Sequence, residues 1–136
     1  MIINCLNLPW PIGKPLINLL QHEISAAGVI GGTSGAVVNF RDPDYDCYST
    51  SSYHPVEIAV NADGQIQYIT DFALYGIPPH VELAKEIDFD FYLKHFQHMG
   101  RVFPIQRGKE LYKLWEQNFV SYYKKNVYSI EVSAWE

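Results

Sequence analysis

The sequence predicts one α+β domain in which a largely antiparallel sheet of about five strands carries two main helices on one face. Its 136 residues fit a single domain, residues 1–136, because that length leaves no room for two independent cores. Two segments repeat apolar residues at helical spacing, and several others alternate polar and apolar residues as strands do. Two helices are too few to cover both faces of a parallel sheet, which favours an antiparallel one.

The first helix is predicted over residues 15–27. Pro15 suits the first helical position, and Gly28 supplies the left-handed conformation that commonly ends a helix. The residues expected on its apolar face are Leu16, Leu19, Leu20, Ile24 and Ala27. The second helix is predicted over residues 108–125. Its expected buried stripe consists of Leu111, Trp115, Phe119 and Tyr122.

Strands are predicted over residues 36–40, 55–60, 65–75, 86–91 and 127–132. Residues 61–64 read Asn-Ala-Asp-Gly, which is strong turn chemistry and predicts a hairpin between the second and third strands. Alternation on the third strand places Ile66, Tyr68, Thr70 and Phe72 opposite Gln67, Ile69 and Asp71. On the fourth strand it places Glu86, Asp88 and Asp90 toward water and Ile87, Phe89 and Phe91 toward the core. Residues 92–105 fit both a short helix and extended chain, so they stay unassigned.

Five runs of sequence carry a resemblance to a known family. They are NFRDPDYDCYSTSSYHPVEI, YITDFALYG, EIDFDF, GRVFPI and GKELYKLWEQNF. Together they resemble a small bacterial (gammaproteobacterial) family, domain of unknown function 2787, over roughly residues 31–133. The resemblance implies a bacterial host but no activity, cofactor or catalytic residue.

The start of the chain lacks the basic flank and long apolar run of a signal peptide, and no stretch approaches the roughly 20 apolar residues of a membrane span. We therefore expect a cytoplasmic protein with no membrane partner. Cys5 and Cys47 form no CxxC pair and are expected to be reduced thiols.

No complete metal-ligand set stands in the sequence, so no metal and no cofactor are expected. Asp42, Asp44 and Asp46 have the spacing of a calcium loop, but the twelfth position of that loop would be Tyr53 rather than glutamate. His95 and His98 would share a face only if their segment were helical.

The candidate binding site is centred on residues 41–54. This segment has no core periodicity yet contains three tyrosines, which supply contact area at low entropic cost. The predicted ligand-binding residues are Arg41, Asp42, Tyr45, Tyr48, Tyr53, His54 and Asp71. An alternative is that the rings only cap the edge of the sheet.

The sequence favours a non-enzymatic binding module for an unknown protein or small ligand. An enzyme of unrecognised type using Arg41, Asp42, His54 and Asp71 is the alternative, although no catalytic motif identifies one. An enzyme should gather several of these groups in one pocket with a shifted pKa, whereas a module should show a flat or grooved aromatic surface. A homo-oligomer is left open.

The charge is unevenly placed along the chain. The net charge of −5 divides into −8 over residues 1–90 and +3 over residues 91–136. Its simplest explanation is neutralisation between parts of one fold. Nucleic-acid binding by the basic C-terminal third is a further alternative. It is disfavoured because the chain is acidic, with a pI of about 5.4, and because Trp115, Phe119 and Tyr122 follow a core period rather than an exposed stacking pattern.

Overall fold

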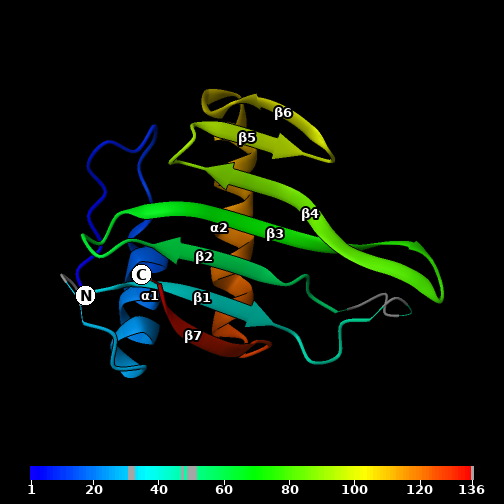
Figure 1. Ribbon diagram of the computed structural model, residues 1–136, viewed down its shortest axis with the longest axis horizontal. Helices are drawn as coiled ribbons and strands as arrows, with labels where there is room; N and C mark the ends of the chain where they lie inside the picture. The colour runs from blue at the N-terminus through cyan, green and yellow to red at the C-terminus, as the bar shows by residue number, and fades with distance from the viewer. Residues whose placement is uncertain (31–32, 47, 49–51, 136) are drawn as a thin grey trace.

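The fold, described for residues 1–30, 33–46, 48 and 52–135 of a computed structural model, is an antiparallel sheet covered by helices (Figure 1). Among these residues, seven strands form one sheet in the order β6-β5-β4-β3-β2-β1-β7. The strands are β1 (Gly35–Arg41), β2 (Val56–Val60), β3 (Ile66–Ile77), β4 (His80–Asp90), β5 (His95–His98), β6 (Arg101–Pro104) and β7 (Ser129–Trp135). The α+β class and the antiparallel sheet are confirmed, but the expected number of about five strands is wrong.

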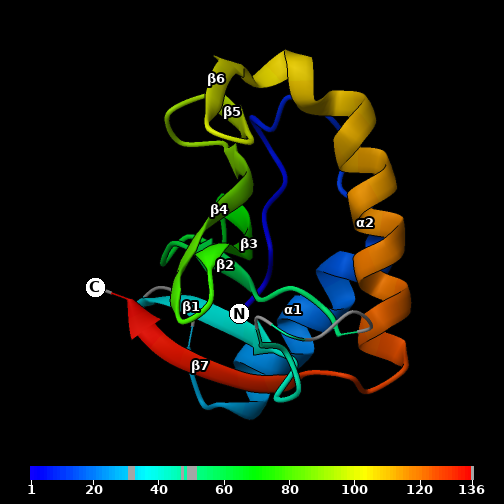
Figure 2. The same cartoon turned by 90° about the vertical axis from the view of Figure 1, so that its right-hand side faces the viewer.

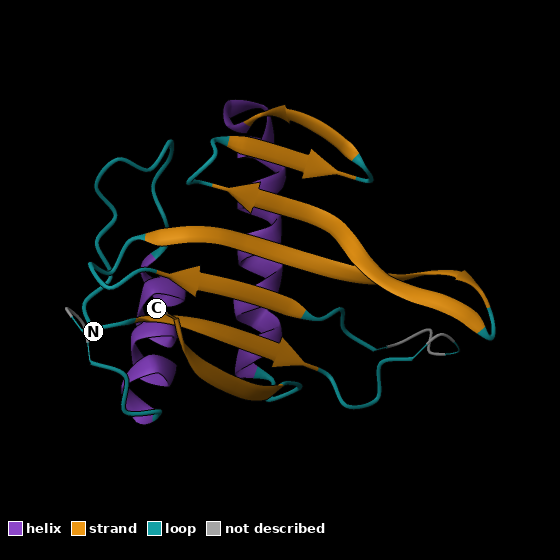
Figure 3. Ribbon diagram, viewed as in Figure 1, coloured by secondary structure: helices purple, strands orange, loops and turns teal. Residues whose placement is uncertain are grey.

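Both helices lie behind the sheet in Figure 3 and on the same side of it in Figure 2. They are α1 (Lys14–Ala26) and α2 (Lys109–Lys124), and a short 3-10 turn, Ile105–Gly108, precedes α2. In α1 the expected apolar face is buried, except that Ala27 is the exposed C-cap residue. Gly28 follows with a φ of +80°, as its predicted stop requires.

The buried stripe of α2 is centred one residue away from the expected one. Tyr112, Trp115 and Phe119 are buried, whereas Leu111 and Tyr122 flank the stripe and are half-buried. No helix in the described part of the chain is long and apolar enough to cross a membrane.

The unassigned residues 92–105 contain the two strands that the sequence analysis missed. β5 and β6 are four residues each, too short to display a strand period. Lys94, Met99 and Gly100 have positive φ angles of 60°, 50° and 82°, which end any helix that the apolar spacing would favour. The sheet also extends further than expected at residues 76–85, where β3 and β4 continue as a long hairpin beyond the other strands (Figure 1).

One row of apolar residues crosses the helix-facing side of the sheet and forms the centre of the core. The row consists of Val38, Ile58, Ile69, Phe89 and Phe96, each paired with the next, and each is at most 6% exposed. Trp10, from the N-terminal segment, packs edge-on against Phe89, with ring centroids 6.2 Å apart. Burial of this row explains why apolar and polar residues alternate along these strands.

Two β-bulges change which residues share a face. The first lies where Ala59 pairs with Tyr68 but Val60 pairs with Ile66. Ile66 and Ile69 are therefore both buried in the core, and the predicted grouping of Ile66 with Tyr68 is wrong. The second bulge lies in β4, where Asp71 pairs with Ile87 but the next residue, Phe72, pairs with Lys85.

Asp88 is buried rather than exposed to water as expected. It is 5% exposed, and Thr70 on the neighbouring strand donates a hydrogen bond to its carboxylate over 2.8 Å. Lys85 approaches the second oxygen at 3.4 Å. Burial raises the pKa of Asp88, against the lowering effect of these two partners.

Cys5 is a free, half-buried cysteine, and burial raises the pKa of its thiol. Cys47 lies outside the described residues. The expected reduced state of the pair stays a prediction.

Candidate functional site

A pocket of about 310 Å³ lies between α2 and the sheet. Figure 2 looks toward the side of the molecule where the sheet, α2 and the segment before β2 meet. The residues that line the pocket are Ser52, Tyr53, His54, Val56, Asp71, Ile87, Leu111, Leu114, Trp115, Asn118, Phe119, Tyr122 and Tyr128. Most of the lining is aromatic or aliphatic, and its polar residues are Ser52, His54, Asp71 and Asn118. We call the His54–Asp71 pair the polar end of the pocket.

Asp71 places a carboxylate on the helix-facing side of the sheet. It stands in register between Val56 of β2 and Ile87 of β4, so its neighbours across the strands are apolar. Trp115 of α2 donates its indole N–H to Asp71 Oδ2 over 3.1 Å. This bond holds one oxygen of the half-buried carboxylate in place, and the other oxygen faces His54.

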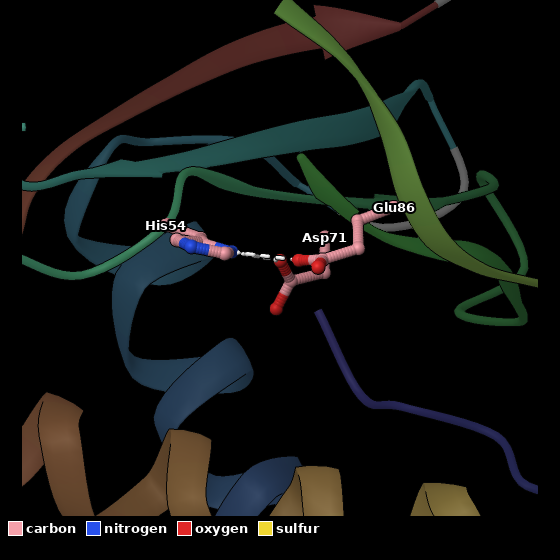
Figure 4. Close-up of side chains that lie close together, drawn as sticks. All are labelled: His54, Asp71 and Glu86. Atoms are coloured by element: carbon pink, nitrogen blue, oxygen red, sulfur yellow. Dashed lines mark hydrogen bonds and ion pairs between the residues drawn. The ribbon is translucent and has the colours of Figure 1, made fainter. Parts of the chain in front are cut away.

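His54 stands immediately before Pro55 and β2, and its imidazole meets two carboxylates (Figure 4). Its Nδ1 lies 3.2 Å from Asp71 Oδ1 and 2.8 Å from Glu86 Oε2. The hydrogen bond to Asp71 raises the pKa of His54 most, and the negative charges of Asp71 and Glu86 add to it. Partial burial opposes the shift, but the net direction is upward.

The second β-bulge explains how Glu86 reaches this cluster. Regular alternation places Glu86 on the same face as Asp88, which is the face opposite Asp71. Glu86 is the extra residue of the bulge, with no partner between the pairs Asp71–Ile87 and Phe72–Lys85. A bulge re-aims a side chain, and here the carboxylate turns toward His54.

Aromatic rings form much of the rest of the lining. Tyr53 lies against Tyr122 of α2, with ring centroids 4.5 Å apart, and 6.5 Å from the ring of Tyr128. Phe119 stacks on Trp115 at 4.9 Å. Burial raises the pKa of Tyr128, so its phenol is neutral across the physiological range.

Four of the seven predicted site residues gather at the pocket. Tyr53, His54 and Asp71 line it. Tyr45 supports them, because its ring centroid lies 5.2 Å from that of His54 and its hydroxyl oxygen accepts the backbone N–H of Leu74 over 3.0 Å. Residues 47 and 49–51 of the predicted segment lie outside the described residues.

The other three predicted residues lie elsewhere. The carboxylate of Asp42 accepts the backbone N–H groups of Asp44 and Tyr53 over 2.9 and 3.0 Å, so it braces the segment. Arg41 is exposed at the end of β1, and Tyr48 is 76% exposed. None of the three lines the pocket.

Some residues of the pocket, and Glu86, which contacts His54 but does not line the pocket, were missed as site residues. Glu86 was assigned to the water-facing side because the bulge leaves no mark in the local sequence. Trp115 and Phe119 were recognised only as core residues, which they also are. His95 and His98 form no helical pair, because they lie three residues apart on β5, where such spacing places side chains on opposite faces.

Comparison with known proteins gives a family and two solved structures. The model of the family described as protein of unknown function (DUF2787) matches residues 14–133 and confirms the resemblance seen in the sequence. No match was found among curated proteins.

The first solved structure is the hypothetical protein VC0508 from the Vibrio cholerae pathogenicity island VSP-II. It is 36% identical, with a TM-score of 0.77 over 91% of this chain and 95% of that chain. The second is the conserved hypothetical protein VC1805 from the Vibrio cholerae pathogenicity island VPI-2, described as sharing structural homology with the human P32 protein. It is 36% identical, with a TM-score of 0.75 over 90% of this chain and 95% of that one.

Proposed function

We propose that this chain, which belongs to the DUF2787 family, is a binding protein that holds a small, ring-bearing ligand in the pocket between α2 and the sheet. The observation that carries the proposal is the His54–Asp71 pair at one end of a pocket whose walls are mainly aromatic and aliphatic. Ligand pockets in proteins combine such walls with a few convergent polar groups that fix orientation.

The size and chemistry of the pocket define the class of ligand. Its volume of about 310 Å³ is at the lower end of the range for small-molecule sites. The half-buried rings of Tyr53, Tyr122 and Tyr128 line the pocket and offer faces and edges for a ring. The carboxylate of Asp71, which lines the pocket, and that of Glu86, which contacts His54, favour a ligand end that donates hydrogen bonds or carries positive charge.

The pocket is held in shape by contacts between its own walls. The Trp115–Asp71 hydrogen bond ties α2 to β3, and the contact of Tyr53 with Tyr122 ties α2 to the segment before β2. Asp42 fixes the backbone of Tyr53 through its N–H group. A pre-formed site loses less conformational entropy on binding, which supports a binding role.

The enzyme alternative is supported by one feature of the site. A carboxylate that holds Nδ1 of a histidine is the arrangement that orients a general base. However, Arg41 and Asp42, which the alternative also requires, do not line the pocket. Only His54 and Asp71 of its four residues line the pocket, so binding is the better supported function.

Nucleic-acid binding has less support. Two of the aromatic residues among the basic positions of α2, Trp115 and Phe119, are 7% and 2% exposed and pack in the core. Stacking on bases requires exposed rings.

The proposal is tested by ligand-observed NMR with a small set of ring compounds: phenol, indole, benzoate and benzylamine. Saturation transfer to at least one compound is expected from the wild-type protein, and benzylamine is favoured over benzoate because of the paired carboxylates. Leu114→Arg should abolish the transfer, because Leu114 is 55% exposed and lines the pocket without being part of the core.

Gln117→Arg is the matched control. Gln117 is exposed on the same helix outside the pocket lining, so this variant adds the same charge and should bind as the wild type does. The proposal fails if no compound binds, or if Leu114→Arg and Gln117→Arg bind equally well.

A further inference from the structure

We propose that His54 Nδ1, Asp71 Oδ1 and Glu86 Oε2 form a binding site for a divalent transition-metal ion of the zinc type. Ligand atoms of these three residues all lie within 4.8 Å of one another (Figure 4). The inference goes beyond the proposed function, because the ion would bind at the polar end of the pocket whether or not a ring compound fills the rest. The preference for benzylamine over benzoate applies to the metal-free protein, since a bound divalent ion would neutralise the two carboxylates.

The two distances from His54 Nδ1 are close to the edges of a coordination shell, one within the expected range and one just below it. With ligand bonds of about 2.0–2.2 Å, neighbouring ligand atoms around zinc are separated by roughly 3.0–3.5 Å. His54 Nδ1 lies 3.2 Å from Asp71 Oδ1 and 2.8 Å from Glu86 Oε2. Only small side-chain adjustments would therefore open the cluster to an ion.

The donor set selects the kind of ion. One imidazole nitrogen and two carboxylate oxygens suit zinc and related transition metals. Calcium and magnesium prefer oxygen ligands alone. When His54 is neutral, Asp71 and Glu86 together supply the two negative charges that balance a divalent cation. Without the ion, a proton on His54 Nδ1 would link the two carboxylates in its place, so zinc would compete with that proton.

Two features outside the three ligands support the site. Trp115 donates to Asp71 Oδ2, the oxygen that does not face His54, and such outer hydrogen bonds orient carboxylate ligands. The bulge in β4 provides the second feature, because it turns Glu86 toward His54 from the position that alternation assigns to the other face. The three ligands are 17 and 15 positions apart in the sequence, a spacing that matches no metal-binding motif, so the absence of a complete motif led to the expectation of no metal.

Isothermal titration of chelator-treated protein with zinc chloride tests the site. One zinc ion per chain is expected to bind, whereas magnesium chloride and calcium chloride should give no comparable signal. Asp71→Asn and Glu86→Gln should each weaken zinc binding at least about tenfold, because each removes a charged ligand while keeping its shape. Glu82→Gln, which changes an exposed glutamate on the same strand, should leave the affinity unchanged.

The far-UV spectrum and melting temperature of each variant show whether it is folded, and Glu86→Gln retains the test if Asp71→Asn is unstable. The inference is overturned if no 1:1 zinc binding occurs, or if Glu86→Gln binds zinc as tightly as Glu82→Gln does. Leu114→Arg should still bind zinc while losing the ring compounds. The metal site and the ring-binding pocket can therefore fail independently.

Discussion

Trp115 on α2 donates its indole N–H to the carboxylate of Asp71 on β3, although 44 residues separate them in sequence. The bond joins the core to the candidate site. Trp115 is 7% exposed and packs on Phe119, while the other oxygen of Asp71 faces His54. One carboxylate thus serves both the attachment of the helix and the polar end of the pocket.

Substitutions of Trp115 should separate its packing from its hydrogen bond. Trp115→Ala removes both and should lower the free energy of unfolding by about 3–5 kcal/mol. Trp115→Phe keeps a ring against Phe119 but leaves Asp71 Oδ2 without its donor, which should cost about 1–3 kcal/mol. Urea unfolding measures both values.

Leu114→Ala is the control for these variants, because Leu114 precedes Trp115 and is 55% exposed. Its effect should stay within about 0.5 kcal/mol. Equal stabilities of Trp115→Phe and the wild type would show that the bond to Asp71 contributes nothing.

The titration of His54 should reveal its two carboxylate partners. In chelator-treated protein, its pKa should lie above the usual 6.5, because Asp71 and Glu86 stabilise the imidazolium. The stability from this raised pKa is fully present below pH 6.5 and is lost as the pH rises through the folded-state value. NMR titration of the histidine ring protons measures it.

Asp71→Asn should lower the pKa of His54 further than Glu86→Gln does, because the hydrogen bond to Asp71 is the largest cause of the shift. A His54→Gln variant assigns the resonance among those of the five histidines. A wild-type pKa at or below 6.5 would show that the cluster does not form in solution.

The three tyrosines of the predicted recognition segment should differ in effect. From sequence, changing Tyr45, Tyr48 and Tyr53 together to serine is expected to abolish partner binding with little loss of stability. The structure divides them. Tyr53→Ser should weaken binding of ring compounds and lower the melting temperature, because its ring packs against Tyr122 and Tyr128. Tyr48→Ser should change neither, because Tyr48 is 76% exposed.

Saturation-transfer NMR and thermal melts measure these two effects on each single variant. If Tyr48→Ser weakened binding as much as Tyr53→Ser, the recognition surface would be the exposed segment rather than the pocket.

The helices and the central strands could be predicted because burial imposes its period on their sequence. The apolar face of α1 repeats over three turns, and alternation in β1 and β2 matches one buried face. β5 and β6 were missed because four residues carry too little of that period, while the spacing of Leu93, Phe96 and Met99 imitates a helix.

The candidate site was predictable only in part. His54 and Asp71 were identified as polar groups beside an aromatic segment, and the structure brings them to 3.2 Å. Glu86 was not identified, because its position depends on a bulge that arises only when β3 and β4 pair. The residues of α2 that line the pocket were assigned only to the core. A helical repeat of apolar residues shows which face of a helix is buried, but not that part of this face borders a pocket.

The central claim is that the pocket between α2 and the sheet binds a ring-bearing ligand, and the indole N–H resonances test it most directly. The chain has three tryptophans, Trp10, Trp115 and Trp135, and only Trp115 lines the pocket. In a ¹⁵N-correlated spectrum recorded with increasing benzylamine or indole, the Trp115 resonance should move in a saturable way while those of Trp10 and Trp135 stay fixed. A Trp115 resonance that stays in place while another indole resonance moves would contradict the account.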